Sequence, residues 1–276
     1  MTNNALDLNN LRLAVLVDAE NVPRNCIKSI MEEIAIYGTP TIKRIYGDWT
    51  SQTVSGWKNS LLENAITPIQ QYSYTTGKNS SDSAMIIDAM DILYSEKTDG
   101  FVIVSSDSDF TRLAIRLREA GQRVIGIGER KTPSAFIAAC DKFTYIEVIR
   151  AGGEAQIIGR EGLTGDNGVD NGQKAQIQQR ERIFHQPTRQ RGVSVPDAIV
   201  QLIADSVADL AGDNGAVFMG ELGNLILKKQ PDFDHRNYGY MSLSAMIKSI
   251  DRFKIEFRQT TDPNIKHVFV QDKEAN

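Results

Sequence analysis

The 276-residue sequence contains only two cysteines, Cys26 and Cys140. Two cysteines cannot build a disulfide framework or complete a four-cysteine zinc site, so we expect a fold that depends on neither. No stretch approaches eighteen consecutive apolar residues, which argues against a membrane-spanning helix. The first residues also lack the basic-then-apolar pattern of a secretory signal. These absences predict a protein of the reducing cytoplasm that makes no contact with membranes.

A strong positive charge is missing as well. The net charge is −4 at pH 7 and the pI is about 5.5, which argues against a protein that coats nucleic acid with a basic surface. A nuclease stays compatible with this balance, because the clustered acids of a metal site lower the total. The composition, 41% hydrophobic and 24% charged, is typical of a globular protein with one large domain or two ordinary ones.

Residues 11 to 149 alternate apolar, strand-like runs with amphipathic stretches of helical period. We expect strands at 11–18, 41–48, 67–74, 100–107, 123–129 and 143–149. Helices are expected at 23–37, 52–64, 80–96, 109–121 and 133–140. The alternation predicts an α/β domain in which a parallel sheet lies between helix layers. Ligands of such sheets bind beyond the carboxyl ends of the strands.

The rest of the chain changes character twice. Residues 151–192 are rich in Gly, Gln, Asn and charge, with little periodicity, and predict a flexible linker. Beyond the linker, three helical stretches precede two alternating strands at 252–259 and 266–272. Three helices and a β-hairpin predict a small winged-helix domain. We therefore expect a first domain over 1–150 and a second over 193–276.

Four aspartates lie at or near the carboxyl edge of the predicted sheet. Asp18 ends the first strand, Asp107 and Asp109 follow the strand that starts at residue 100, and Asp82 opens the helix after the third strand. In a parallel sheet these positions share the carboxyl edge. Four carboxylates that converge there repel one another, and a divalent cation removes that conflict. Mg²⁺ or Mn²⁺, which prefer oxygen ligands, would also lower the pKa of a bound water and stabilise charge on a scissile phosphate.

Other roles stay open for some of these acids. Asp82 and Asp109 also fit as N-caps of the helices that they begin. Asp88 lies six residues after Asp82, about 240° further round the helix, so both cannot point squarely at one ion. Asp88 therefore fits either a supporting role behind the site or a salt bridge.

Four polar residues close to these aspartates are candidates for supporting roles. Asn21 fits a helix cap or a contact with metal-bound water. Lys78 fits a phosphate contact or an ordinary surface lysine. Ser105 and Ser106 either donate to a phosphate or satisfy the turn in which they lie.

Several familiar active-site patterns are incomplete. Residues 77–80 have the ending of a P-loop, but Tyr72 stands where the first glycine belongs. Residues 126–128 lack the rest of a dinucleotide fingerprint. The histidines lie outside the α/β region, which argues against a histidine-based nuclease and against a serine triad; they are His185, His235 and His267.

Three motifs together resemble the NYN family, a branch of the PIN-like nucleases. They are VDAEN at 17–21, KNSSDSAMIID at 78–88 and SSDSDF at 105–110, in the order and spacing of that family. The resemblance covers about residues 10 to 150 and implies a PIN-like three-layer fold and a Mg²⁺- or Mn²⁺-dependent ribonuclease, which we take to be an endonuclease. The polar Ser81 departs from the apolar residue common before the second acid. The metal acids that the resemblance implies are Asp18, Asp82, Asp107 and Asp109, with Asn21 and Asp88 in support.

Residues 193 to 272 resemble the LOTUS domain, also called OST-HTH, a winged helix linked to RNA binding. This resemblance implies RNA, single-stranded or structured, as a partner. Residues 193–276 hold nine Lys and Arg against twelve Asp and Glu, so RNA binding would need a local patch. The charged candidates for that patch are Arg252, Lys254, Arg258 and Lys266. Tyr238 and Tyr240 are available for stacking on bases, or belong to the core.

Three functions remain open at this point. The first is a ribonuclease that uses Asp18, Asp82, Asp107 and Asp109. The second is a non-catalytic RNA-binding adaptor that keeps the same fold. The third is a phosphatase or receiver-like domain with Asp18 as its nucleophile and Lys131 as the partner lysine. The sequence is also compatible with a homo-oligomer.

Overall fold

A computed structural model of the chain describes residues 11–51, 54–72, 80–152, 194–212, 215–259 and 266–275. Contacts divide the chain into two compact units. One comprises Met1–Gly153 with Leu227–Phe233, and the other comprises Glu154–Ile226 with Asp234–Asn276. Most of the predicted linker, residues 153–192, lies outside the described residues. Within the described ranges, every helix is too short or too polar to reach across a bilayer.

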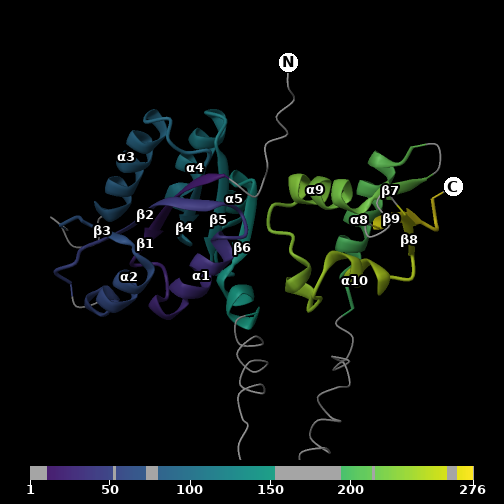
Figure 1. Ribbon diagram of the computed structural model, residues 1–276, viewed down its shortest axis with the longest axis horizontal. Coiled ribbons are helices and arrows are strands. Elements are labelled where there is room, and N and C mark those ends of the chain that lie inside the picture. The colour runs from purple at the N-terminus through teal and green to yellow at the C-terminus, as the bar shows by residue number, and fades with distance from the viewer. Residues whose placement is uncertain are drawn as a thin grey trace, which may run out of the picture. The chain divides into compact units, whose positions relative to one another are not determined.

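The first unit is built on a six-stranded sheet in which every strand pair is parallel (Figure 1). The strand order is β3-β2-β1-β4-β5-β6. The strands are β1 (Arg12–Asp18), β2 (Thr39–Gly47), β3 (Thr67–Gln70), β4 (Gly100–Val104), β5 (Arg123–Gly128) and β6 (Lys142–Tyr145). The two central strands are apolar nearly throughout, because helices cover both of their faces. This architecture confirms the predicted α/β fold.

Helices cover both faces of the sheet and bury two separate cores. Side chains of β1 alternate between them, with Val15 and Val17 on one side and Ala14 and Leu16 on the other. The first core is closed by α1 (Ile27–Ile34), by α2 (Lys58–Asn64) and by the helical residues 146–152. The second is closed by α3 (Ser80–Tyr94), α4 (Thr111–Glu119) and α5 (Ser134–Ala139). Short 3-10 turns η1 (Arg24–Cys26), η2 (Ser55–Trp57) and η3 (Ser108–Phe110) precede α1, α2 and α4.

The strand order reverses between β1 and β4. From β1 the chain adds β2 and then β3 on one side, and the connecting helices α1 and α2 cover one face of the sheet. It then returns to the centre at β4 and adds β5 and β6 on the other side, with α3, α4 and α5 on the opposite face. The loops after β1 and β4 therefore diverge, and in sheets of this kind ligands bind at that point. Asp18 and the segment that follows Val104 lie at this point.

Several predicted strands extend past the observed ends, since β3 ends at Gln70 and β4 at Val104, and the last strand shows the clearest error. The run at 143–149 is rich in β-branched and aromatic residues, but β6 stops at Tyr145 and residues 146–152 are helical. Ile146 and Ile149 are both buried in the first core, and their three-residue spacing places them on one helix face. Packing against the sheet therefore outweighs local strand propensity here.

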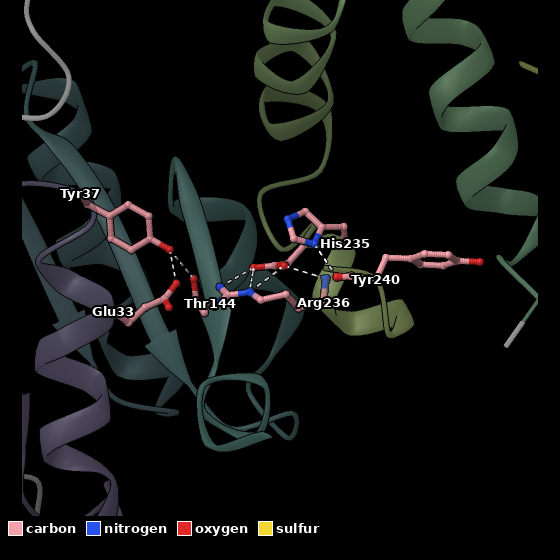
Figure 2. A network of polar contacts seen from close by, with 7 residues as sticks. Glu33, Tyr37, Thr144, His235, Arg236 and Tyr240 are labelled. Carbon is pink, nitrogen blue, oxygen red and sulfur yellow. Dashed lines mark hydrogen bonds and ion pairs between the residues drawn. The ribbon is translucent and has the colours of Figure 1, made fainter. Parts of the chain in front are cut away.

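A buried polar group ties α1 to β6. The hydroxyl of Tyr37 donates to the carboxylate of Glu33 at 2.5 Å and lies 3.4 Å from the Thr144 hydroxyl (Figure 2). Glu33 is only 6% exposed, so this bond satisfies a carboxylate that has little access to water.

The second unit has the winged-helix architecture that the sequence predicts (Figure 1). Its helices are α8 (Asp197–Leu210), α9 (Met219–Lys229) and α10 (Leu243–Lys248), with a 3-10 turn η4 (His235–Tyr238). Strands β8 (Phe253–Gln259) and β9 (Lys266–Asp272) form the expected hairpin pair. The structure adds a third strand, β7 (Ala216–Phe218), which pairs with β9 to give the order β7-β9-β8. At three residues, β7 is too short to show a periodic pattern in the sequence.

Candidate metal centre

Asp18 is the most enclosed carboxylate at the carboxyl edge of the sheet. It is the last residue of β1 and is 1% exposed. One of its oxygens accepts a bond from the backbone N–H of Glu20 at 3.0 Å. The other accepts from the Asn21 amide at 2.7 Å and from the Ser105 hydroxyl at 2.9 Å. Donors from two loops therefore hold this side chain in one orientation.

Three further carboxylates lie close together at the same edge of the sheet. Asp82 stands in the first turn of α3, and Asp107 and Asp109 lie in the turn that joins β4 to α4. One carboxylate oxygen from each of the three lies within 4.8 Å of the other two. Asp107 also caps the 3-10 turn by accepting from the Asp109 backbone N–H at 2.9 Å. Capping and metal binding are thus compatible at Asp107.

The electrostatics of this group show an excess of negative charge. Burial, together with the charges of Asp18 and Asp107, raises the pKa of Asp82 to about 7. The charges of Glu20 and Asp109 contribute to this same rise. Burial also raises the pKa of Glu20, with help from Asp18. Carboxylates in this situation either take up a proton or bind a cation.

The donor set fits a hard divalent cation. Its side-chain ligand atoms are carboxylate oxygens, the type that Mg²⁺ and Mn²⁺ prefer. The three oxygens are close enough to share one ion, and Asp18 lies near enough to influence the ionisation of Asp82. The site could therefore hold a metal and use it to polarise a phosphate and a water.

Sequence reasoning missed two further acids at this edge, Glu20 and Asp48. Glu20 follows Asp18 by two residues, and Asp48 comes directly after β2. Both follow strands whose carboxyl ends meet here, so the rule that selected Asp107 applies to them as well.

The four polar residues proposed to support the site do not all contact its carboxylates. Ser105 and Asn21 both contact Asp18. Ser106 instead accepts from the backbone N–H of Glu129 at 2.8 Å and joins the loops after β4 and β5. Lys78 lies outside the described residues.

Asp88 is not part of the three-carboxylate group. It forms an ion pair with Arg44 of β2 and accepts a hydrogen bond from the hydroxyl of Tyr46. Tyr46 is almost fully buried, and its pKa is raised by burial and by the bond to Asp88. Of the two roles left open by the sequence, the salt bridge is the one that the structure shows.

Lys131, the partner lysine of the phosphatase alternative, pairs with a different carboxylate. Its ammonium lies 2.6 Å from the carboxylate of Glu129 in its own loop. That pairing raises the pKa of Lys131.

The candidate RNA-binding residues of the second unit are mostly engaged by neighbours. Arg252 pairs with the buried Asp272 at 2.8 Å. The hydroxyl of Tyr240 accepts from Ser249 at 2.7 Å, and its backbone carbonyl lies 2.8 Å from Nδ1 of His235 (Figure 2). Tyr238 is half-buried in η4. The side chain of Lys266 lies outside the described residues.

Two of these candidates stay partly exposed. Lys254 and Arg258 lie on β8, with 56% and 42% of their side chains exposed. Both contact the carboxylate of Glu256, at 2.8 Å and 3.4 Å.

Comparisons with known proteins match both units. Residues 12–147 match the family model of the NYN domain, and residues 194–265 match that of the OST-HTH/LOTUS domain. A solved protein of unknown function from Vibrio parahaemolyticus is 19% identical, with a TM-score of 0.43, over 53% of this chain and 96% of its own. An uncharacterized protein from Nitrosomonas europaea is 30% identical, with a TM-score of 0.28, over 33% of this chain and 89% of its own. A comparison with curated proteins gave no match.

Proposed function

This chain belongs to the NYN family through residues 12–147 and carries an OST-HTH/LOTUS domain at residues 194–265, and on that premise we propose that it is a metal-dependent ribonuclease. NYN domains belong to a nuclease superfamily, and OST-HTH/LOTUS domains bind RNA. We assign residues 1–150 to hydrolysis of RNA phosphodiester bonds and residues 193–276 to RNA binding, with 151–192 as the linker.

The observation that supports this proposal is the carboxylate geometry at the strand reversal. Asp82 comes from the first turn of α3, and Asp107 and Asp109 come from the turn after β4, yet one oxygen from each lies within 4.8 Å of the other two. Helix capping alone explains single aspartates, but it does not bring three together beside the buried Asp18. The raised pKa of Asp82 marks the electrostatic cost of this arrangement without a cation.

The Mg²⁺ or Mn²⁺ ion would be held by Asp82, Asp107 and Asp109, with Asp18 as the fourth carboxylate of the site. When bound, such an ion supplies charge stabilisation to the scissile phosphate and acidity to a water. The protein supplies the fixed geometry. Asn21 and Ser105 orient Asp18, and the Ser105 hydroxyl also accepts the backbone N–H of Asp107 at 3.1 Å. One buried serine thus sets the spacing between the loops after β1 and β4.

A nuclease assay on labelled single-stranded RNA tests the proposal. We expect cleavage with Mg²⁺ or Mn²⁺, none with chelator, and none by Asp18→Asn. The asparagine keeps one oxygen that can accept from Asn21 and Ser105, and circular dichroism verifies that the variant is folded. A circular substrate tests the proposed endonucleolytic mode, because it has no end for an exonuclease. Undiminished cleavage by a contaminant-free Asp18→Asn protein would refute the site assignment. RNA binding without turnover in either metal would instead favour the adaptor.

We also propose a cytoplasmic location. The two cysteines, Cys26 and Cys140, are both buried as unpaired thiols, which suits a reducing compartment.

A further inference from the structure

The three-stranded sheet of the second unit presents two unlike faces. Val217 of β7, Val270 of β9 and Phe253 of β8 are buried in the interior, and α8 and α10 contact the strands. Side chains alternate along each strand, so the neighbours of these residues point to the opposite side. We call that side the outer sheet face, and it comprises Phe218, His267, Phe269, Lys254, Glu256 and Arg258.

Aromatic rings form a continuous row on the outer sheet face. Phe218 and Phe269 are directly paired across β7 and β9, with ring centroids 5.9 Å apart. His267, two residues before Phe269, places its ring 5.1 Å from that of Phe218. His267 is exposed and both phenylalanines are half-buried, so the row faces outward rather than into the core. Gly220 makes room for it, because a Cβ there would lie 2.7 Å from the Phe218 ring.

Cationic side chains flank the aromatic row. The guanidinium of Arg258 lies over the ring of Phe269, 4.3 Å from its centroid. Lys254 lies four residues before Arg258 on β8, with more than half of its side chain exposed. Glu256, directly opposite Phe269, binds both cations and offsets part of their charge.

We propose that the outer sheet face is a stacking platform for unpaired bases of single-stranded RNA. Sheets that present aromatic rings bind bases by their faces, while neighbouring cations contact the phosphates. The match of this unit to the OST-HTH/LOTUS domain favours RNA over a protein as the ligand of this face. The alternatives within this unit are weaker, because Arg252 is held by the buried Asp272 and the Tyr240 hydroxyl by Ser249. The inference rests on the proposed function only in taking RNA as the ligand.

Binding of a short labelled oligo(A) to the full chain tests the platform, with chelator present so that no RNA is cleaved. Phe269→Leu keeps an apolar, strand-compatible side chain but loses the ring. We expect it to weaken binding about tenfold, as is typical for the loss of one stacked base. Phe257→Leu is the matched control, because Phe257 lies on the same strand pair, is 68% exposed and points to the other side. It should bind as the wild type does.

A second variant tests the charge arrangement. Glu256→Gln removes the acid between Lys254 and Arg258, so we expect tighter binding and a steeper loss of affinity with salt. Unchanged affinity in both Phe269→Leu and Phe218→Leu, with folding verified by circular dichroism, would overturn the platform. Equal weakening of RNA binding by Phe257→Leu would also overturn it. The same holds if Phe269→Leu and Phe218→Leu abolish self-association of the chain and leave RNA binding unchanged. Platform-dependent binding by a chain that never cleaves RNA would leave this inference standing while the nuclease proposal fails.

Discussion

The hydroxyl of Ser105 donates to a carboxylate oxygen of Asp18 across 2.9 Å. Asp18 ends β1 and Ser105 follows β4, so this bond joins the two strands between which the sheet reverses its order. The same hydroxyl accepts the Asp107 backbone N–H. One fully buried side chain therefore couples the orientation of one acid to the backbone of another.

Ser105→Ala should lower cleavage without removing any carboxylate. Loss of the bond to Asp18 frees that side chain to rotate, and changes of this type cost about 10- to 100-fold in activity or metal affinity. Steady-state cleavage rates at saturating Mn²⁺ and across a metal titration measure both effects. Ser108→Ala is the control, because Ser108 lies in the same turn but is exposed. Equal activity of the two variants would contradict the positioning role.

Divalent cations should stabilise the folded protein. An ion that binds only the native state raises the unfolding temperature as its concentration increases. Thermal unfolding followed with and without Mg²⁺ or Mn²⁺ measures this shift, independently of any cleavage. Asp107→Asn should greatly reduce it, whereas Asp91→Asn should not, because Asp91 is an exposed acid elsewhere on α3. A full shift in Asp107→Asn would remove Asp107 from the site.

The free energy of unfolding should depend on pH through the protonation of Asp82. Its folded pKa of about 7 lies above the ordinary aspartate value of 3.8, so between these two values the native state retains a proton that the unfolded chain has lost. In metal-free protein this contribution to stability is complete below about pH 4 and is lost as the pH rises to about 7, with a slope of up to ~1.4 kcal/mol per pH unit. Urea unfolding at pH 5 and pH 8 measures it, and Asp82→Asn is the matched reference. Identical pH profiles for the two proteins would contradict the raised pKa.

Tyr46→Phe should cost stability more than activity. The variant removes a buried hydroxyl that donates to Asp88, which typically costs about 1 kcal/mol in the free energy of unfolding. Asp88 lies outside the three-carboxylate group, so cleavage well below the unfolding temperature should change only a few-fold. A hundredfold loss of cleavage with unchanged stability would show that the Arg44, Tyr46 and Asp88 cluster acts on the site itself.

Much of the first unit could be predicted because its strands are buried on both faces. Continuous apolar runs such as that of β1 have no competing interpretation once helical stretches alternate with them. The aspartates at strand ends followed from the same topology, because parallel strands place all their carboxyl ends at one edge. The helix at 146–152 and the strand β7 could not be predicted, since one contradicts its local propensity and the other is too short to show any pattern.

The amino-acid sequence by itself determined the order of strands and helices and the edge at which the acids gather, because both depend on local periodicity and on strand direction. Only the tertiary structure decided which side chains meet. It drew Asp82, Asp107 and Asp109 into one group, turned Asp88 toward Arg44, and aligned Phe218 with Phe269 on an outward face. Such pairings depend on the angles and registers at which separate elements pack, and no pattern along a single element encodes them.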